Sequence, residues 1–175
     1  MPLHRSGLAT NSLLKEMWEE NYLKRNRCKF EISSGSMRPL IEVGNVITVK
    51  KIELEKIEIG DVIAFQDGEN VIVHRVIGKS WSHGQIYFRH IGDAGSVSRL
   101  VPGTTLIGRV IVIEKGRGNI RLDSRKYLIR NRISGWRLGL VDSVHRKQFR
   151  YFGINLKIVL GPVWNLGRLL LVRRY

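Results

Sequence analysis

The sequence has 175 residues, enough for one compact domain with an appendage. A hydrophobic content of 43% and a charged content of 26% are ordinary for a globular protein and exclude disorder of the whole chain. Lys and Arg number 30 against 15 Asp and Glu, and the formal net charge of +15 favours an anionic partner such as a lipid surface or nucleic acid. The single cysteine, Cys28, excludes an internal disulfide and a metal site built from cysteines.

The positive charge is concentrated in the last third of the sequence. Residues 1–114 hold 15 basic and 13 acidic side chains, whereas residues 115–175 hold 15 basic and 2 acidic side chains. In this tail the cations alternate with large aliphatic and aromatic residues, a pattern typical of amphipathic helices on an anionic membrane. A tail that folds back to cap the preceding domain fits equally well. Nucleic acid is the less favoured partner, because the cations do not gather on a polar face.

No membrane span or cleaved secretory signal is expected. Charged residues interrupt residues 1–30, so the apolar core that a secretory signal needs is missing. The longest uncharged run, Ile158–Gly167, has ten residues, whereas a spanning helix needs about 20. We therefore expect a cytoplasmic protein that the basic tail can attach peripherally to the inner membrane face.

Hydrophobic periodicity predicts three segments. Residues 1–27 form an N-terminal segment with an amphipathic helix over 10–27, and residues 28–116 form a mostly β domain. Residues 117–175 form the basic, helical C-terminal tail, which begins where the composition changes around Arg117. No helical crossovers separate the β-branched runs, so a doubly wound parallel sheet is not expected. The predicted strands are Val46–Val49, Val62–Phe65, Val71–Ile77, Gln85–His90 and Leu106–Ile113.

Two segments of the β domain carry residues suited to catalysis. Ser36 follows Gly35 in a predicted turn, where glycine allows a peptide to approach the serine hydroxyl closely. His74 interrupts an apolar strand, where an ionisable side chain needs a hydrogen-bond partner or a chemical role. Each feature alone is more often structural. Together with Gly92-Asp93 downstream, they favour a catalytic serine and histidine.

At these residues the sequence resembles the serine peptidases of the type I signal peptidase superfamily, which also contains the self-cleaving SOS repressors. The resemblance covers residues 30–114. It implies the catalytic β fold of that superfamily and cleavage of a leader or signal peptide. A histidine stands where the usual bacterial branch has a lysine, so the chain is similar to the archaeal, endoplasmic reticulum and sporulation-associated branch. The blocks that carry it are Ser34-Gly35-Ser36-Met37 with Pro39, Gly60 to Phe65, Val73 to Ile77, and Gly92-Asp93 followed by Ile107 to Val110.

The resemblance also implies a role for each site residue. Ser36 is the expected nucleophile and His74 the general base. The backbone N–H of Ser36 and the hydroxyl of Ser34 are expected to stabilise the oxyanion. Asp93 is the candidate for orienting His74, although a local turn hydrogen bond explains an aspartate there equally well. The substrate is expected to lie extended beside a strand, with small side chains in shallow pockets.

The sequence departs from the family pattern in three places. Residues 94–99 lack the carboxylate that usually follows Gly-Asp in the histidine branch, and Arg99 stands near its place. The Gly-Asp that follows the serine box is Gly44-Asn45, whose Asn can still make the local turn bond. The expected membrane anchor is missing, so either the basic tail substitutes for it or the substrate is a soluble leader peptide.

Two other functions remain open. One is a catalytically weak or inactive module of the same fold that binds a peptide, as the missing carboxylate suggests. The other is a self-cleaving, DNA-associated regulator, although residues 1–27 hold only one predicted helix and no helix-turn-helix. No cofactor or metal is expected, because the remaining histidines lack the spacing of metal ligands. They are His4, His83, His90 and His145.

Overall fold

The computed structural model describes residues 24–95, 97–116 and 118–151, which form a mostly β unit with one long helix after the sheet. Most of the helix expected over 10–27 lies outside these residues. Residues 24 and 25 are helical, and the first strand begins at Arg27. The elements are β1 (Arg27–Glu31), β2 (Val46–Lys50), η1 (Leu54–Lys56), β3 (Val62–Asp67), β4 (Asn70–Ser82), β5 (Gln85–Ile91), β6 (Arg99–Pro102), η2 (Gly103–Thr105), β7 (Leu106–Lys115), β8 (Gly118–Arg121) and α2 (Arg125–Tyr151).

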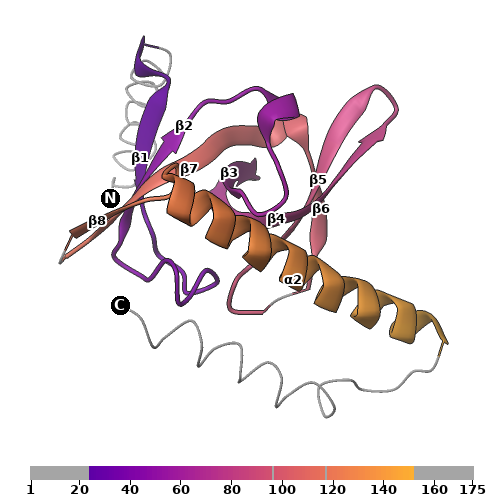
Figure 1. The fold of residues 1–175 in the computed structure, drawn as a ribbon. Coiled ribbons are helices and arrows are strands. Elements are labelled where there is room, and N and C mark those ends of the chain that lie inside the picture. Colours follow the sequence, from indigo (N-terminus) through magenta and orange to yellow (C-terminus); the bar gives the residue numbers. More distant parts are fainter. Residues whose placement is uncertain (1–23, 96, 117, 152–175) are drawn as a thin grey trace, which may run out of the picture.

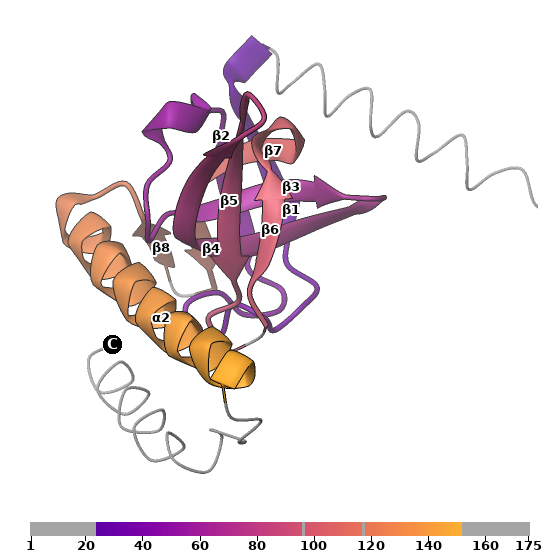
Figure 2. The same cartoon turned by 90° about the vertical axis from the view of Figure 1, so that its right-hand side faces the viewer.

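The strands form one antiparallel sheet in the order β1-β2-β7-β3-β4-β5-β6, and β8 pairs with β7. The prediction of a mostly β fold without parallel crossovers is confirmed, as are the five predicted strands. Register shifts interrupt the pairing of β2 with β7, β3 with β7 and β4 with β5. Such irregularities increase local twist, and the sheet curls on itself (Figures 1 and 2).

The curled sheet buries both faces of β3. Val62 and Ala64 belong to one apolar cluster, whereas Ile63 and Phe65 belong to another, because successive side chains of a strand point to opposite faces. All four are at most 3% exposed, which explains the unbroken apolar run in the sequence. The neighbouring β4 continues this arrangement and places His74 opposite Ile63.

Helix α2 lies along the outside of the sheet beside β4 (Figure 2). Its contact with the turn before β3 depends on two glycines. A Cβ on Gly135 would lie 2.5 Å from the Cα and N atoms of Gly60, and a Cβ on Gly60 would lie 2.3 Å from the carbonyl oxygen of Asn131. The helix and the turn therefore approach with backbone against backbone. Leu138, 5% exposed, completes the contact by packing with Ile77 and Ile91.

The described part of the tail is integrated with the sheet. Strand β8 pairs with β7, and Leu122, 3% exposed, joins the larger apolar cluster. None of the helices within the described residues has a stretch long and apolar enough to cross a membrane.

Substituting Gly135 tests the close contact of α2. We expect Gly135→Ala to lower the free energy of unfolding by about 1–2 kcal/mol, because the overpacking cost exceeds the gain of about 1 kcal/mol in helix propensity. Gly139→Ala is the matched control, since it brings the same propensity gain but its Cβ would lie 3.2 Å from the nearest atom, Ile77 O. Urea unfolding followed by circular dichroism measures both. Equal stability of the two variants would contradict the close backbone contact of α2 at Gly135.

Candidate active site

Ser36 lies in the loop between β1 and β2, half-buried and next to a firmly anchored residue. Met37 is 2% exposed and Ile41 is 0% exposed, and the Ile41 N–H donates to the Met37 carbonyl at 3.0 Å. These apolar anchors hold the loop against the core. Farther along the loop, Asn45 Oδ1 accepts a hydrogen bond from the Glu42 N–H at 3.0 Å. The prediction that Asn45 still makes the local turn bond is confirmed.

Gly92 separates the Ser36 backbone from the His74 ring. A Cβ on Gly92 would lie 2.6 Å from Ser36 O and 3.3 Å from His74 Nε2. The next turn of chain fixes this approach, because the Ala94 N–H donates to Ser36 O at 2.9 Å. The serine loop and the histidine strand can therefore meet only because residue 92 has no side chain. Gly92 thus lies in contact with both the Ser36 carbonyl and the Nε2 side of the His74 ring.

Ser36 and His74 line the same groove, of about 260 Å³. One wall comes from the end of β1 and the serine loop, and the other from the start of β4. Ser36 Oγ lies 3.4 Å from Ser34 Oγ, and within the described residues no hydrogen bond joins Ser36 to His74. The lining residues are Phe30, Glu31, Ile32, Ser33, Ser34, Ser36, Met37, Val71, Ile72, Val73 and His74.

Both walls of the groove include strand edges that have no strand partner within the described residues. Strand β1 pairs only with β2. Residues 70–74 of β4 pair with β3 on one side, whereas pairing with β5 begins at Arg75. Unpaired edges offer N–H and C=O groups to an added strand. The groove is therefore suited to an extended peptide.

His90 is the hydrogen-bond partner of His74. The two Nδ1 atoms are 3.0 Å apart, and the ring of Phe65 packs on His90 at a centroid distance of 4.6 Å. Burial lowers the pKa of His90 to about 4, and the charges of His74 and Arg99 act in the same direction. Burial also lowers the pKa of His74 from its ordinary value of 6.5; the charge of Asp93 opposes this shift and that of Arg99 adds to it. Both rings are therefore neutral at pH 7.

This pairing allows His74 to keep its basic lone pair on Nε2. Between two neutral imidazoles one Nδ1 must donate and the other must accept. When His74 Nδ1–H donates to His90 Nδ1, the lone pair of His74 stays on Nε2, which is the atom near Gly92 and Ser36. This is the tautomer that a general base requires. A histidine thus occupies the position that a carboxylate holds in a conventional triad.

Asp93 is held by Arg75. Its Oδ1 and Oδ2 accept hydrogen bonds from Arg75 Nε and Nη2 at 2.7 and 2.6 Å. Arg75 is 2% exposed, and its Nη1 also donates to Gly60 O at 2.8 Å and to Asn131 Oδ1 at 3.1 Å. Asp93 thus fixes the segment that contains Gly92, and its charge acts on His74 through space. Its proposed role in orienting His74 stays a prediction.

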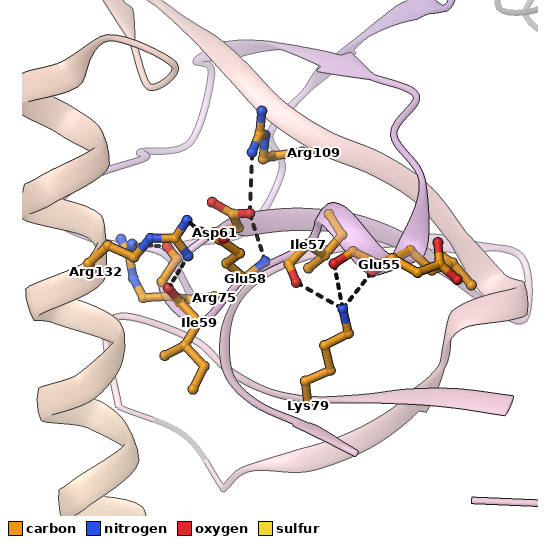
Figure 3. Close-up of polar contacts among 11 residues, drawn as sticks. Glu55, Ile57, Glu58, Ile59, Asp61, Arg75, Lys79, Arg109 and Arg132 are labelled. Carbon is orange, nitrogen blue, oxygen red and sulfur yellow. Dashed lines mark hydrogen bonds and ion pairs between the residues drawn. The ribbon is translucent and has the colours of Figure 1, made fainter. Parts of the chain in front are cut away.

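Asp61 supports the turn that faces Arg75 (Figure 3). It is 3% exposed, and its Oδ2 accepts the Glu58 N–H at 3.0 Å and lies 3.4 Å from Arg109 Nη1. Burial raises the pKa of Asp61, and the cations of Arg109 and Arg75 oppose that shift. The Asp61 carbonyl accepts the Val76 N–H at 2.8 Å. The Gly60-Asp61 block therefore braces β4 next to His74.

Sequence reasoning did not single out His90, Arg75 or Asn131. A signal was available for Arg75, because an arginine inside the apolar run of residues 71–77 must find buried acceptors. No comparable signal marks Asn131, which lies on the basic helix 56 residues beyond Arg75. Within the parts of the chain that the structure describes, no group of three or more His, Cys, Asp or Glu side chains is placed to hold a metal.

A scan against protein-family models and a search of curated proteins both find no match.

The electrostatic environment of the histidine pair can be tested without an activity assay. In an NMR titration of the imidazole Cε1–H signals, we expect His90 to titrate near pH 4 and His74 below 6.5. Arg99→Gln removes a cation that disfavours both imidazolium forms, so both pKa values should rise. Arg27→Gln, which removes an exposed cation on β1, is the control. A His74 pKa above 6.5 in the unaltered protein, or unchanged pKa values in Arg99→Gln, would contradict this account of the histidine pair.

Proposed function

We propose that this protein is a serine endopeptidase of the type I signal peptidase superfamily, with its catalytic β fold, that cleaves a leader or signal peptide. The observation that carries the proposal is that Ser36 and His74, far apart in the sequence, line one groove and that Gly92 contacts both the Ser36 carbonyl and the side of the His74 ring that carries Nε2. Ser34 beside Ser36, and the strand edges along the groove, give further support.

The proposed reaction begins with attack of Ser36 Oγ on the carbonyl carbon of the scissile peptide bond. His74 Nε2 takes the hydroxyl proton as the new C–O bond forms. Since Ser36 Oγ is hydrogen-bonded to Ser34 in the free protein, the attack requires that bond to break. A substrate carbonyl that draws the Ser34 hydroxyl to itself would release Ser36 Oγ for this step.

The oxyanion would be held by two donors on the serine loop. The Ser36 N–H has no acceptor within the described residues, and the Ser34 hydroxyl lies 3.4 Å from the Ser36 hydroxyl. Each donor of this type contributes about 3–4 kcal/mol to stabilising a transition state. When the intermediate collapses, the C–N bond breaks and His74 returns the proton to the leaving amine. Water then attacks the acyl-serine, His74 takes a proton from the water, and Ser36 recovers the hydroxyl proton as the acid leaves.

The second candidate is a catalytically weak or inactive module that holds a peptide in the same groove. Two observations favour it: Ser36 and His74 are not hydrogen-bonded to each other within the described residues, and Arg99 on β6 pairs with His90 on β5, where its charge lowers the pKa of His74. Such a module would bind a presequence peptide and leave it intact.

Replacement of the serine distinguishes the two candidates. We expect the purified protein to cleave internally quenched peptides that carry Ala-x-Ala sites, and Ser36→Ala to reduce kcat/KM by at least about 1,000-fold. Ser80→Ala is the control, because Ser80 lies on the far part of β4, outside the groove. This variant should cleave the peptides as well as the unaltered protein does. Binding of the peptides without cleavage would favour the module, and cleavage that survives Ser36→Ala would refute the serine mechanism.

A second prediction concerns His90 as a positioning residue. His90→Leu removes the acceptor for His74 Nδ1–H, so we expect kcat to fall about 10- to 100-fold with KM nearly unchanged. His90→Gln supplies an amide oxygen as acceptor and should restore part of kcat. Unaltered cleavage by His90→Leu would show that the histidine pair has no part in the reaction. Equal losses in both variants, accompanied by a lower melting temperature, would indicate a structural role.

A further inference from the structure

Helix α2 has one face that is buried toward the sheet and, on its opposite side, an apolar face that is exposed. The inward residues recur at spacings of four, three and four: Asn131, Gly135, Leu138 and Asp142 are all buried. A second set recurs at spacings of four, three, four and four on the opposite side. This outer stripe consists of Ile129, Ile133, Trp136, Leu140 and Val144, which are 56%, 65%, 64%, 66% and 44% exposed.

The outer stripe is continuous and straight. At 1.5 Å of rise per residue, Ile129 to Val144 spans about 22 Å along one line of the helix. Single exposed apolar side chains are common, but a row of five aligned on one helix marks an interaction surface. The stripe also includes a tryptophan, which is favoured at membrane interfaces.

Cations border the outer stripe, and the helix offers almost no negative charge in return. Lys126, Arg130 and Arg137 line a shallow hollow of about 240 Å³ together with Ile129, Ile133 and Ser134. Within residues 125–146 the single carboxylate is Asp142, which is 7% exposed and pairs with Arg146 at 2.9 Å. The partner must therefore offer apolar groups beside a layer of negative charge.

We propose that the outer stripe of α2 docks on the surface of an anionic lipid bilayer. Its five apolar side chains would enter the boundary between headgroups and acyl chains, while the bordering cations contact lipid phosphates. This interaction does not depend on the proposed peptidase activity. It narrows the membrane attachment expected from the basic tail to one face of one helix.

Charge argues against the two other occupants that the chain itself could supply. Residues 152–175 contain four basic and no acidic side chains, so they would bring like charge to the hollow. A second copy would face its own Lys126, Arg130 and Arg137 with the same cations in a symmetric interface. An anionic bilayer satisfies both the apolar stripe and its basic border.

Vesicle co-sedimentation of the full chain tests the proposal. We expect binding to phosphatidylcholine vesicles that contain about 30% phosphatidylglycerol at about 0.1 M salt, and much weaker binding to pure phosphatidylcholine or at about 1 M salt. Absence of binding to the anionic vesicles, or equal binding to the neutral ones, would overturn the proposal.

Two double variants with matched side chains locate the surface. Trp136→Gln with Leu140→Gln alters the outer stripe and should weaken partition into anionic vesicles at least about tenfold. Trp81→Gln with Leu100→Gln replaces equally apolar residues that are 68% and 52% exposed on β4 and β6, and should bind as the unaltered protein does. Equal binding by the two variants would contradict the proposal that the outer stripe contacts the bilayer. Circular dichroism and melting temperature verify that both are folded.

Tryptophan quenching and sedimentation velocity distinguish a bilayer from the two other candidate occupants, residues 152–175 and a second copy of the chain. Iodide should quench Trp136 fluorescence in a variant whose other tryptophans are replaced by Phe, and anionic vesicles should reduce that quenching. Protection of Trp136 before vesicles are added would mean that residues 152–175 or a second copy cover the stripe, and would overturn the proposal. Sedimentation velocity then distinguishes these two occupants. A dimer that dissociates in the Trp136→Gln, Leu140→Gln variant would identify the second copy.

Discussion

The buried guanidinium of Arg75 joins three parts of the chain that would otherwise have no reason to meet. Its fork contacts Asp93 after β5, the carbonyl of Gly60 before β3, and the side chain of Asn131 on α2. An arginine that is 2% exposed is stable only when such acceptors surround it, because desolvation of an unpaired charge costs several kcal/mol. The requirement to satisfy Arg75 therefore fixes where the segment after β5 and the long helix must lie.

The contacts of Arg75 also determine what surrounds His74, the residue before it on β4. Successive side chains of a strand point to opposite faces, so Arg75 holds the 92–94 segment from one side while His74 faces the other. This segment places Gly92 against the Ser36 backbone, and its Ala94 N–H donates a hydrogen bond to the Ser36 carbonyl. Asp93 thus anchors that segment through its paired hydrogen bonds with Arg75, and its charge acts on His74 through space.

The choice of histidine as the partner of His74 has an electrostatic cost and a structural benefit. A neutral acceptor stabilises an imidazolium less than a carboxylate does, and the charge of Arg99 also lowers the pKa of His74, so in the proposed reaction His74 would be a weaker base than the histidine of a conventional triad. The benefit is that a neutral histidine can be buried beside an apolar ring. His90 is buried and packs on Phe65. An ionised carboxylate there would itself need a buried cation.

The sequence allowed the β class and five strands to be predicted, because those strands carry strong runs of β-branched residues. It did not reveal β1, β6 or β8, which are short, hold few apolar residues and are defined by their pairing with β2, β5 and β7. Ser36, His74 and Asp93 could be selected as residue types, but their placement depends on the register of β3 with β4 and on the loop approach at Gly92. No local pattern encodes such long-range contacts.

Helix α2 connects the two surfaces to which function is assigned. Its inner face is linked through Asn131 and Arg75 to Asp93, in the segment that lies against Ser36, and its backbone lies too close to Gly60 for the helix to roll without losing the hydrogen bond from Arg75 to Asn131. Its outer stripe points directly away from the sheet. If the stripe lies on a bilayer, the sheet stands above the membrane in one orientation, and the groove is held at a set height and angle to the lipid surface. A peptide that leaves the membrane in an extended form would then meet the strand edges of β1 and β4 along a defined path.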